Sequence, residues 1–216
     1  MRLATGAELY RADRLSERIR RLRFTCPRVD EGWEPGDKIL MRVAARARRA
    51  YTLSAVDAAR RTFEIVAVAH DGGPGGRWVR DADEGQVIEL LGPRRDVDTR
   101  GGTDGTTVML GDETALGLFA ALREGAGSDA EFAGAVERTS VHDGAVAALA
   151  LPLRGVVRDG GSPGRALVKW LQARPATVHD TAFVVAGHRL AVRSTLATLR
   201  DLGAPFSAVR GRVYWG

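Results

Sequence analysis

The pattern of hydrophobic and polar positions in the first half of the chain predicts a series of short strands. Residues 21–26 alternate polar and apolar side chains, which is the period of a half-buried strand. Within 33–37, Pro35 and Gly36 favour a turn, because proline presets one backbone dihedral and glycine frees the next. Further strands are predicted at 38–43, 49–54, 63–69 and 87–91. Many short strands with turn signals between them indicate a small barrel or sandwich.

The second half of the chain has a different rhythm, in which short apolar strands alternate with amphipathic helices. Strands are predicted at 107–110, 156–157, 183–186 and 206–213, and helices at 114–123, 166–173 and 190–202. This alternation predicts a parallel α/β sheet. The polar, glycine-rich stretch 96–105 separates the two patterns. We therefore expect two domains, 1–98 and 99–216.

Composition narrows the class of protein. A hydrophobic content of 44% and a charged content of 27% over 216 residues are ordinary for a globular protein. No apolar run approaches the roughly 20 residues that cross a bilayer, and the first residues lack the apolar core of a secretory signal. Cys26 is the only cysteine, which excludes an intrachain disulfide and a cysteine-based metal cluster. We expect a cytoplasmic protein without membrane insertion.

The net charge of +5 comes largely from arginine, since Lys38 and Lys169 are the only lysines. A basic chain can bind nucleic acid, an acidic membrane surface or small anions such as nucleotide phosphates. Nucleic-acid binding favours clustered basic residues with interleaved aromatics, whereas these arginines are dispersed and aromatic residues make up 6% of the chain. We expect no nucleic-acid partner.

The segment 49–54 brings an arginine, an aromatic ring and a hydroxyl within four residues. In a strand, Tyr51 and Leu53 would face one side and Thr52 and Ser54 the other. The Arg49 guanidinium can bind phosphate, the Tyr51 ring can lie against an isoalloxazine, and the Thr52 hydroxyl can reach a ring nitrogen. An ordinary edge strand with one solvated arginine is the alternative interpretation.

Two loops are further candidates for ligand binding. The segment 70–78 (His-Asp-Gly-Gly-Pro-Gly-Gly-Arg-Trp) follows a buried strand and opens a predicted helix, whose first amides attract phosphate. The segment 110–116 lies where a strand turns into a helix, the usual ligand position of α/β sheets. There Asp112 can cap the helix and Thr114 can contact a nucleotide. A flexible surface loop and a simply capped helix are the alternatives.

Hydrolytic and metal chemistry receive little support from the sequence. The four histidines, His70, His142, His179 and His188, are scattered without metal-ligand spacing. The chain contains no G-x-S-x-G elbow, no G-x-G-x-x-G fingerprint and no Walker A motif.

The motifs together resemble the siderophore-interacting protein family, a branch of the ferredoxin-reductase-like flavoproteins. In chain order they are Arg49-x-Tyr51-Thr52, His70 with Gly73-Pro74 and Trp78, Gly92-Pro93, 111–116 (Gly-Asp-Glu-Thr-Ala-Leu), Ala186-Gly187 and Tyr214-Trp215. The similarity spans about residues 8–215. It implies a six-stranded antiparallel FAD-binding β-barrel at 1–98 and a parallel-sheet NAD(P)H-binding α/β domain at 99–216. The implied reaction is reduction of ferric siderophores to release ferrous iron.

The resemblance also assigns site residues. It implies that Arg49, Tyr51 and Thr52 hold the flavin, with Thr52 near its N5, and places Ser54 in the same motif. It implies that the loop holds the pyrophosphate and adenine side of FAD through His70, Gly72, Gly73, Pro74, Gly76 and Trp78. Asp112, Thr114 and Ala115 would line the nicotinamide nucleotide site, and Tyr214 and Trp215 would close over it near the flavin.

The chain departs from the family pattern at several positions. The second arginine of R-x-Y-T-x-R is Ser54, which removes one phosphate partner, and the usual proline after Thr-Ala-Leu is Gly117. The usual A-G-E ends in His188, and the Y-W-R-x-G ending stops at Gly216. We expect these changes to affect the choice between NADPH and NADH more than FAD binding.

Two rival functions stay open at this point. One is a reductase on the same scaffold that passes electrons to free flavin, a quinone or an iron–sulfur or haem partner. The other is a non-catalytic FAD-binding protein in which the departures mark decay of the nucleotide site. We expect a monomer or weak dimer whose substrate is a ferric siderophore, drawn in by arginines such as Arg42, Arg46 and Arg48.

Overall fold

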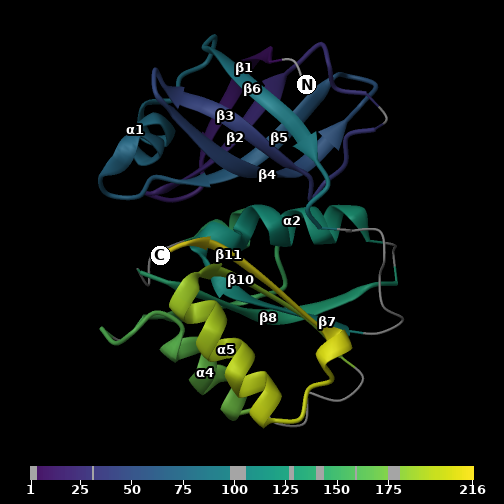
Figure 1. Cartoon of the computed structure of the whole chain (residues 1–216), viewed down its shortest axis with the longest axis vertical. Helices are drawn as coiled ribbons and strands as arrows, with labels where there is room; N and C mark the ends of the chain where they lie inside the picture. The colour runs from purple at the N-terminus through teal and green to yellow at the C-terminus, as the bar shows by residue number, and fades with distance from the viewer. Residues whose placement is uncertain are drawn as a thin grey trace. The chain divides into compact units, whose positions relative to one another are not determined.

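The computed structural model describes residues 4–30, 32–97, 106–126, 129–139, 144–158, 160–174 and 181–216 (Figure 1). The chain forms two compact units. The first holds the described residues up to Val97 together with Gly117–Gly125, and the second holds the remaining described residues from Thr106 onwards. Most of the predicted linker 96–105, along with His142 and His179, lies outside the described residues.

The described part of the first unit contains a closed barrel of six antiparallel strands in the order β1-β2-β5-β4-β3-β6. Their bounds are β1 Thr5–Arg14, β2 Ile19–Thr25, β3 Lys38–Ala44, β4 Ala47–Asp57, β5 Thr62–Val68 and β6 Val87–Arg94. The strands alternate inward apolar and outward polar residues. Phe24 and Phe63 stack inside the barrel with ring centroids 5.0 Å apart, and Trp33 lies 5.8 Å from Phe63. The predicted antiparallel barrel is confirmed.

Two helices belong to the barrel unit: α1 Gly73–Asp81 and α2 Leu116–Gly125. Helix α1 lies against β3, β4 and β5, and its Val79 and the following Ala82 join the barrel core. Helix α2 approaches β5 through Gly117, where an added Cβ would lie 3.3 Å from the Val66 carbonyl oxygen. Glycine in place of the usual proline therefore permits a close backbone approach.

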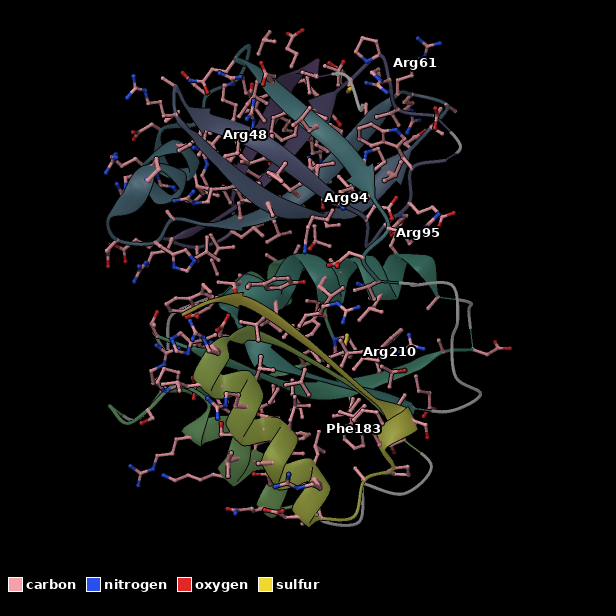
Figure 2. The ribbon with its side chains drawn as sticks, in the orientation of Figure 1. Arg48, Arg61, Arg94, Arg95, Phe183 and Arg210 are labelled. Carbon is pink, nitrogen blue, oxygen red and sulfur yellow. The ribbon has the colours of Figure 1, made fainter. Side chains whose placement is uncertain are left out.

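The second unit contains a parallel five-stranded sheet, counted over its described residues, in the order β11-β10-β7-β8-β9. The strands are β7 Thr106–Asp112, β8 Glu131–Arg138, β9 Arg154–Val157, β10 Ala182–His188 and β11 Val209–Trp215. Helices α4 Arg165–Gln172 and α5 Arg189–Asp201 lie side by side along one face (Figure 1). Between them and the sheet lies a core that includes the fully buried Phe183, labelled in Figure 2. The predicted parallel α/β sheet is confirmed.

Several elements differ from the sequence prediction. The predicted helix 114–123 is divided into the 3₁₀ turn η1 Glu113–Ala115 and α2, and the predicted strand 206–213 begins as the 3₁₀ turn η3 Phe206–Ala208 before β11. The pattern also missed β1, the short helix α3 Ala145–Ala148, and β8, the strand with Gly134 at its centre. An added Cβ at Gly134 would lie 1.9 Å from the Met109 carbonyl oxygen, so β8 requires a residue that weakens the strand signal. Among the described residues, no helix combines the length and apolar character needed to cross a membrane.

Candidate functional site

Strand β4 and helix α1 bring the two flavin motifs of the sequence together. The Arg49 side chain runs along α1 at Gly75, where an added Cβ would lie 3.0 Å from Arg49 Cγ and 3.4 Å from Nε. The rings of Tyr51 and Trp78 lie 5.5 Å apart at an interplanar angle of 52°. An arginine, two aromatic rings and a glycine-rich helix start, separated by more than 20 residues in the chain, therefore share one place on the barrel.

The start of α1 has the backbone geometry of an anion site. Gly72 and Gly73 both have positive φ, at 73° and 72°, which side-chain-bearing residues rarely adopt. Gly72 is the N-cap without a side-chain cap, Pro74 lies in the first turn, and that turn contains no acidic residue. Its amides carry the positive end of the helix dipole, so this end of α1 favours an anion.

Gly76 fixes the helix against the preceding loop. A Cβ there would lie 2.0 Å from the His70 carbonyl oxygen and 3.0 Å from its amide nitrogen, so glycine alone fits. This close approach explains the glycine at position 76.

Tyr51 presents a neutral ring at this place. Its side chain packs against the barrel core, and burial raises the pKa of its phenol, with the nearby Arg49 opposing part of the shift. The ring therefore stays protonated at neutral pH and offers a flat apolar face with a hydroxyl at its rim.

The other two members of the β4 motif occupy different surroundings. Thr52 is half-buried and pairs with Lys38 across the β3–β4 ladder. Ser54 is 1% exposed and its hydroxyl donates to Glu64 Oε1 at 3.1 Å. Glu64 also pairs with Arg23 at 3.0 Å, so Ser54 belongs to a polar network between β2, β4 and β5. The contact favours a structural role for Ser54.

The basic residues that precede the motif are partly neutralised. Arg42 and Arg48 both contact Glu89 Oε1, at 2.8 and 3.0 Å, and they lower the pKa of that carboxyl, Arg48 most. Arg48 and Arg94 are labelled on the barrel in Figure 2.

In the second unit, Asp112 organises the carboxyl ends of three strands. Its fully buried carboxylate accepts from the Thr114 amide at 2.9 Å, the His188 amide at 2.7 Å and the Trp215 Nε1 at 3.3 Å, and also from the Thr114 hydroxyl. The predicted helix-capping contact of Asp112 is thus present. Both oxygens have internal donors, so Asp112 shapes this edge of the sheet and holds Thr114 and Trp215 beside each other.

Other predicted residues lie near this edge of the sheet. Ala115 is fully buried, and Gly187, with φ of 128°, leaves its Cβ position 2.6 Å from Asp112 Oδ2. His188 accepts from the Leu190 amide through Nδ1 at 3.1 Å, which caps α5, and its ring meets Trp215 edge-on at 4.5 Å. Cofactor-binding roles for Asp112, Thr114, Ala115 and Trp215 stay predictions.

Sequence reasoning missed two arginines that contact residues 69–82, the segment that includes α1. Arg18 contacts the loop before α1 and Arg20 contacts the end of α1. More than 50 residues separate each arginine from its partners, and no local pattern signals such contacts.

The closed barrel followed by a parallel five-stranded sheet is the ferredoxin-reductase-like two-domain fold. Phthalate dioxygenase reductase shares it, with a TM-score of 0.71 and 17% identity over 98% of this chain and 68% of that chain.

Part of the chain matches a family model, and solved structures share its fold. Residues 33–97, which span β3 to β6 and α1, match the family model described as siderophore-interacting FAD-binding domain. The siderophore-interacting protein SipS of Aeromonas hydrophila superposes with a TM-score of 0.81 and 23% identity, over 99% of this chain and 92% of that one. A siderophore-interacting protein of Acinetobacter baumannii gives 0.79 and 18%, over 99% and 90%. Comparison with curated protein sequences gives no match. The predicted resemblance to the siderophore-interacting family is confirmed for residues 33–97, and this match supports a flavin oxidoreductase as the class of protein.

Proposed function

We propose that the chain is an FAD-dependent oxidoreductase that takes electrons from NAD(P)H and reduces ferric siderophores, so that ferrous iron is released. One observation carries the proposal. Arg49, Tyr51, Trp78 and the glycine-rich start of α1 lie together within 33–97, the segment that matches the siderophore-interacting FAD-binding family.

The residues present fit FAD. Arg49 offers a guanidinium fork for a phosphate, and the amides at the start of α1 suit a pyrophosphate. The two positive-φ glycines leave open space at their Cβ positions, which lets a ligand approach the backbone. Tyr51 offers a face for the isoalloxazine and Thr52 a hydroxyl for a ring nitrogen. FAD, when bound, supplies the hydride and single-electron chemistry.

We assign NAD(P)H to the second unit, at the carboxyl ends of β7 and β10, where parallel sheets bind ligands. There Asp112 holds Thr114 and Trp215 in fixed positions, and Ala115 contributes a small buried side chain. In this proposal residues 1–98 bind the flavin and 99–216 bind the nicotinamide nucleotide.

The proposed substrate is an anionic ferric chelate. Reduction by one electron converts ferric to ferrous iron, which siderophores hold weakly. Arg42 and Arg48 share one carboxylate, Glu89, so this group keeps a net positive charge that attracts an anion. The siderophore-interacting proteins that share the fold support this choice of substrate.

A reductase for a protein acceptor is the second candidate. The ferredoxin reductase in carbazole 1,9a-dioxygenase superposes on this chain with a TM-score of 0.79 and 18% identity. The match covers 98% of this chain and 69% of the reductase. The same scaffold therefore serves more than one electron acceptor.

The third candidate is a non-catalytic FAD-binding protein. It predicts that NAD(P)H does not reduce the bound flavin.

A three-stage assay separates the candidates. The purified protein is first incubated with FAD, desalted and examined for bound flavin absorbance. NADPH or NADH is then added without oxygen, and a ferric siderophore with a ferrous-iron trap is added last. The proposal predicts bleaching followed by trapped ferrous iron. Bound flavin that neither nucleotide bleaches would favour the non-catalytic protein, and bleaching without trapped iron would favour another acceptor.

A further inference from the structure

We propose that Arg20 is a positioning residue that holds helix α1 for the second phosphate and adenosine of FAD, and thereby makes the protein prefer FAD to FMN. This inference rests on the proposed function and concerns one side chain of β2, 53 residues before the helix begins.

The Arg20 side chain caps the carboxyl end of α1 with hydrogen bonds. Its Nη1 donates to the carbonyl oxygens of Val79 at 3.2 Å, Arg80 at 3.1 Å and Ala82 at 2.6 Å. Last-turn carbonyls lack partners within a helix and carry its negative end, which a guanidinium neutralises. The C-cap Ala82 is extended rather than left-handed, so α1 lacks the common glycine ending that would satisfy these carbonyls through the backbone.

Helix α1 needs such external support. It has nine residues and includes three glycines and a proline, and isolated helices of that length are marginal in water. Its packing on the barrel rests on Val79 and the half-buried Trp78. Gly76 fixes the helix near its start, and Arg20 adds three contacts at its carboxyl end.

A second arginine secures the other end of the segment more weakly. Arg18 donates through Nε to the Ala69 carbonyl at 3.3 Å and pairs with Asp71 at 3.1 Å. The Asp71 side chain is 87% exposed, and such surface pairs contribute little. Of the two arginines, Arg20 makes more contacts, at the carboxyl end of α1. We infer that it positions the start of α1 through the helix as a whole.

The two halves of FAD depend on different parts of this site. The ring system would meet Tyr51 and Thr52 on β4, whose backbone is held by the ladder with β3. Only the Tyr51 ring also contacts α1, through Trp78. The pyrophosphate would meet the start of α1. Loosening α1 should therefore weaken FAD binding while FMN, which carries the same rings and a single phosphate, is held nearly as before.

The test compares Arg20→Ala and Arg20→Lys with wild type and with Arg23→Ala. Arg23 lies on the same strand and pairs with Asp13 and Glu64 instead of α1, so its variant controls for loss of an arginine from β2. Dissociation constants for FAD and FMN are measured by quenching of flavin fluorescence. Hydrogen–deuterium exchange across 73–81 reports the helix itself.

We expect Arg20→Ala to raise the FAD dissociation constant about tenfold, on the scale of one lost charge-assisted hydrogen bond, and to change that for FMN less than twofold. Exchange in 73–81 should accelerate, and Arg20→Lys should recover part of the affinity. Equal losses for both flavins, or no loss, would overturn the inference. If Arg20→Ala fails to fold, Arg20→Lys carries the same comparison. Wild-type protein that binds no flavin would instead overturn the proposed function.

Discussion

Two adjacent glycines of α1 illustrate how single residues shape the proposed flavin site. Gly76 abuts backbone, since a Cβ there would lie 2.0 Å from the His70 carbonyl oxygen. Gly75 abuts the flexible side chain of Arg49. Alanine should therefore act differently at the two positions, although both lie in the same helix.

Gly76→Ala should lower the free energy of unfolding by about 2 kcal/mol, because the overpacked backbone must shift. Gly75→Ala should leave stability within about 1 kcal/mol of wild type, because alanine favours the helix while Arg49 moves aside. It should nevertheless weaken FAD binding through the displaced guanidinium. Urea unfolding and flavin titration measure the two effects, and equal stability of both variants would contradict the assignment.

Tyr51 tests the aromatic face of the site. Tyr51→Ala removes the ring beside Trp78 and should weaken FAD binding about tenfold or more, on the scale of base–aromatic stacking. Tyr51→Phe keeps the ring and should retain most of the affinity. Fluorescence titration of the two variants decides the point. Unchanged affinity in Tyr51→Ala would remove Tyr51 from the site.

At the scale of elements, Asp112 joins the ends of β7, β10 and β11 through a single carboxylate. Asp112→Asn replaces one acceptor oxygen by a donor that faces N–H groups. The free energy of unfolding should fall by about 3 kcal/mol, and Trp215 emission should change as its indole loses its acceptor. Asp201→Asn, an exposed change at the end of α5, serves as the control and should stay within about 0.5 kcal/mol. An Asp112→Asn variant as stable as wild type, with wild-type Trp215 emission, would show that the Asp112 carboxylate does not hold these strand ends together.

Glu113, in the turn η1, should make the stability of the fold depend on pH. Burial raises the pKa of the Glu113 carboxyl above its ordinary 4.5, although hydrogen bonds from Thr139 lower it in part. The folded protein thus binds this proton more tightly than the unfolded chain does. The stability that Glu113 contributes is full below pH 4.5 and is lost as the pH rises through the raised pKa.

Glu113→Gln removes this titration while keeping an acceptor for Thr139. The variant should lose that part of the pH dependence and should be at least as stable as wild type at pH 7. Thermal unfolding of both proteins between pH 4.5 and 7.5 measures the difference. Parallel stability curves would show that Glu113 titrates alike in the folded and unfolded chain.

The elements that sequence predicted well are those with clear periodicity. Strands β3 and β5 and helices α4 and α5 follow the apolar pattern closely, because their buried faces dictate it. Strand β8 gave no signal, because its packing against β7 requires Gly134. Periodicity also marked α2 as a helix without indicating that it groups with the barrel, since such a contact joins residues distant in sequence.

At the scale of the whole molecule, sequence likewise predicted some parts of the proposed site and missed others. The motif residues Arg49, Tyr51 and 70–78 could be singled out because their residue types suit a flavin nucleotide, and the structure brings them together. The contacts that hold these residues in place could not be predicted from sequence. These contacts depend on geometry across the fold. They are the bond from Arg20 to the end of α1, the close packing of Gly76 on the His70 backbone, and the bond from Trp215 to Asp112.

The central claim, that electrons pass from NAD(P)H through bound flavin to a ferric siderophore, is tested most directly by anaerobic titration of the FAD-loaded protein. We predict that the flavin absorbance bleaches on addition of NADPH or NADH, returns when a ferric siderophore is added, and is accompanied by a stoichiometric amount of trapped ferrous iron. Flavin that stays oxidised in excess nucleotide, or reduced flavin that leaves the ferric siderophore unchanged, would contradict the account.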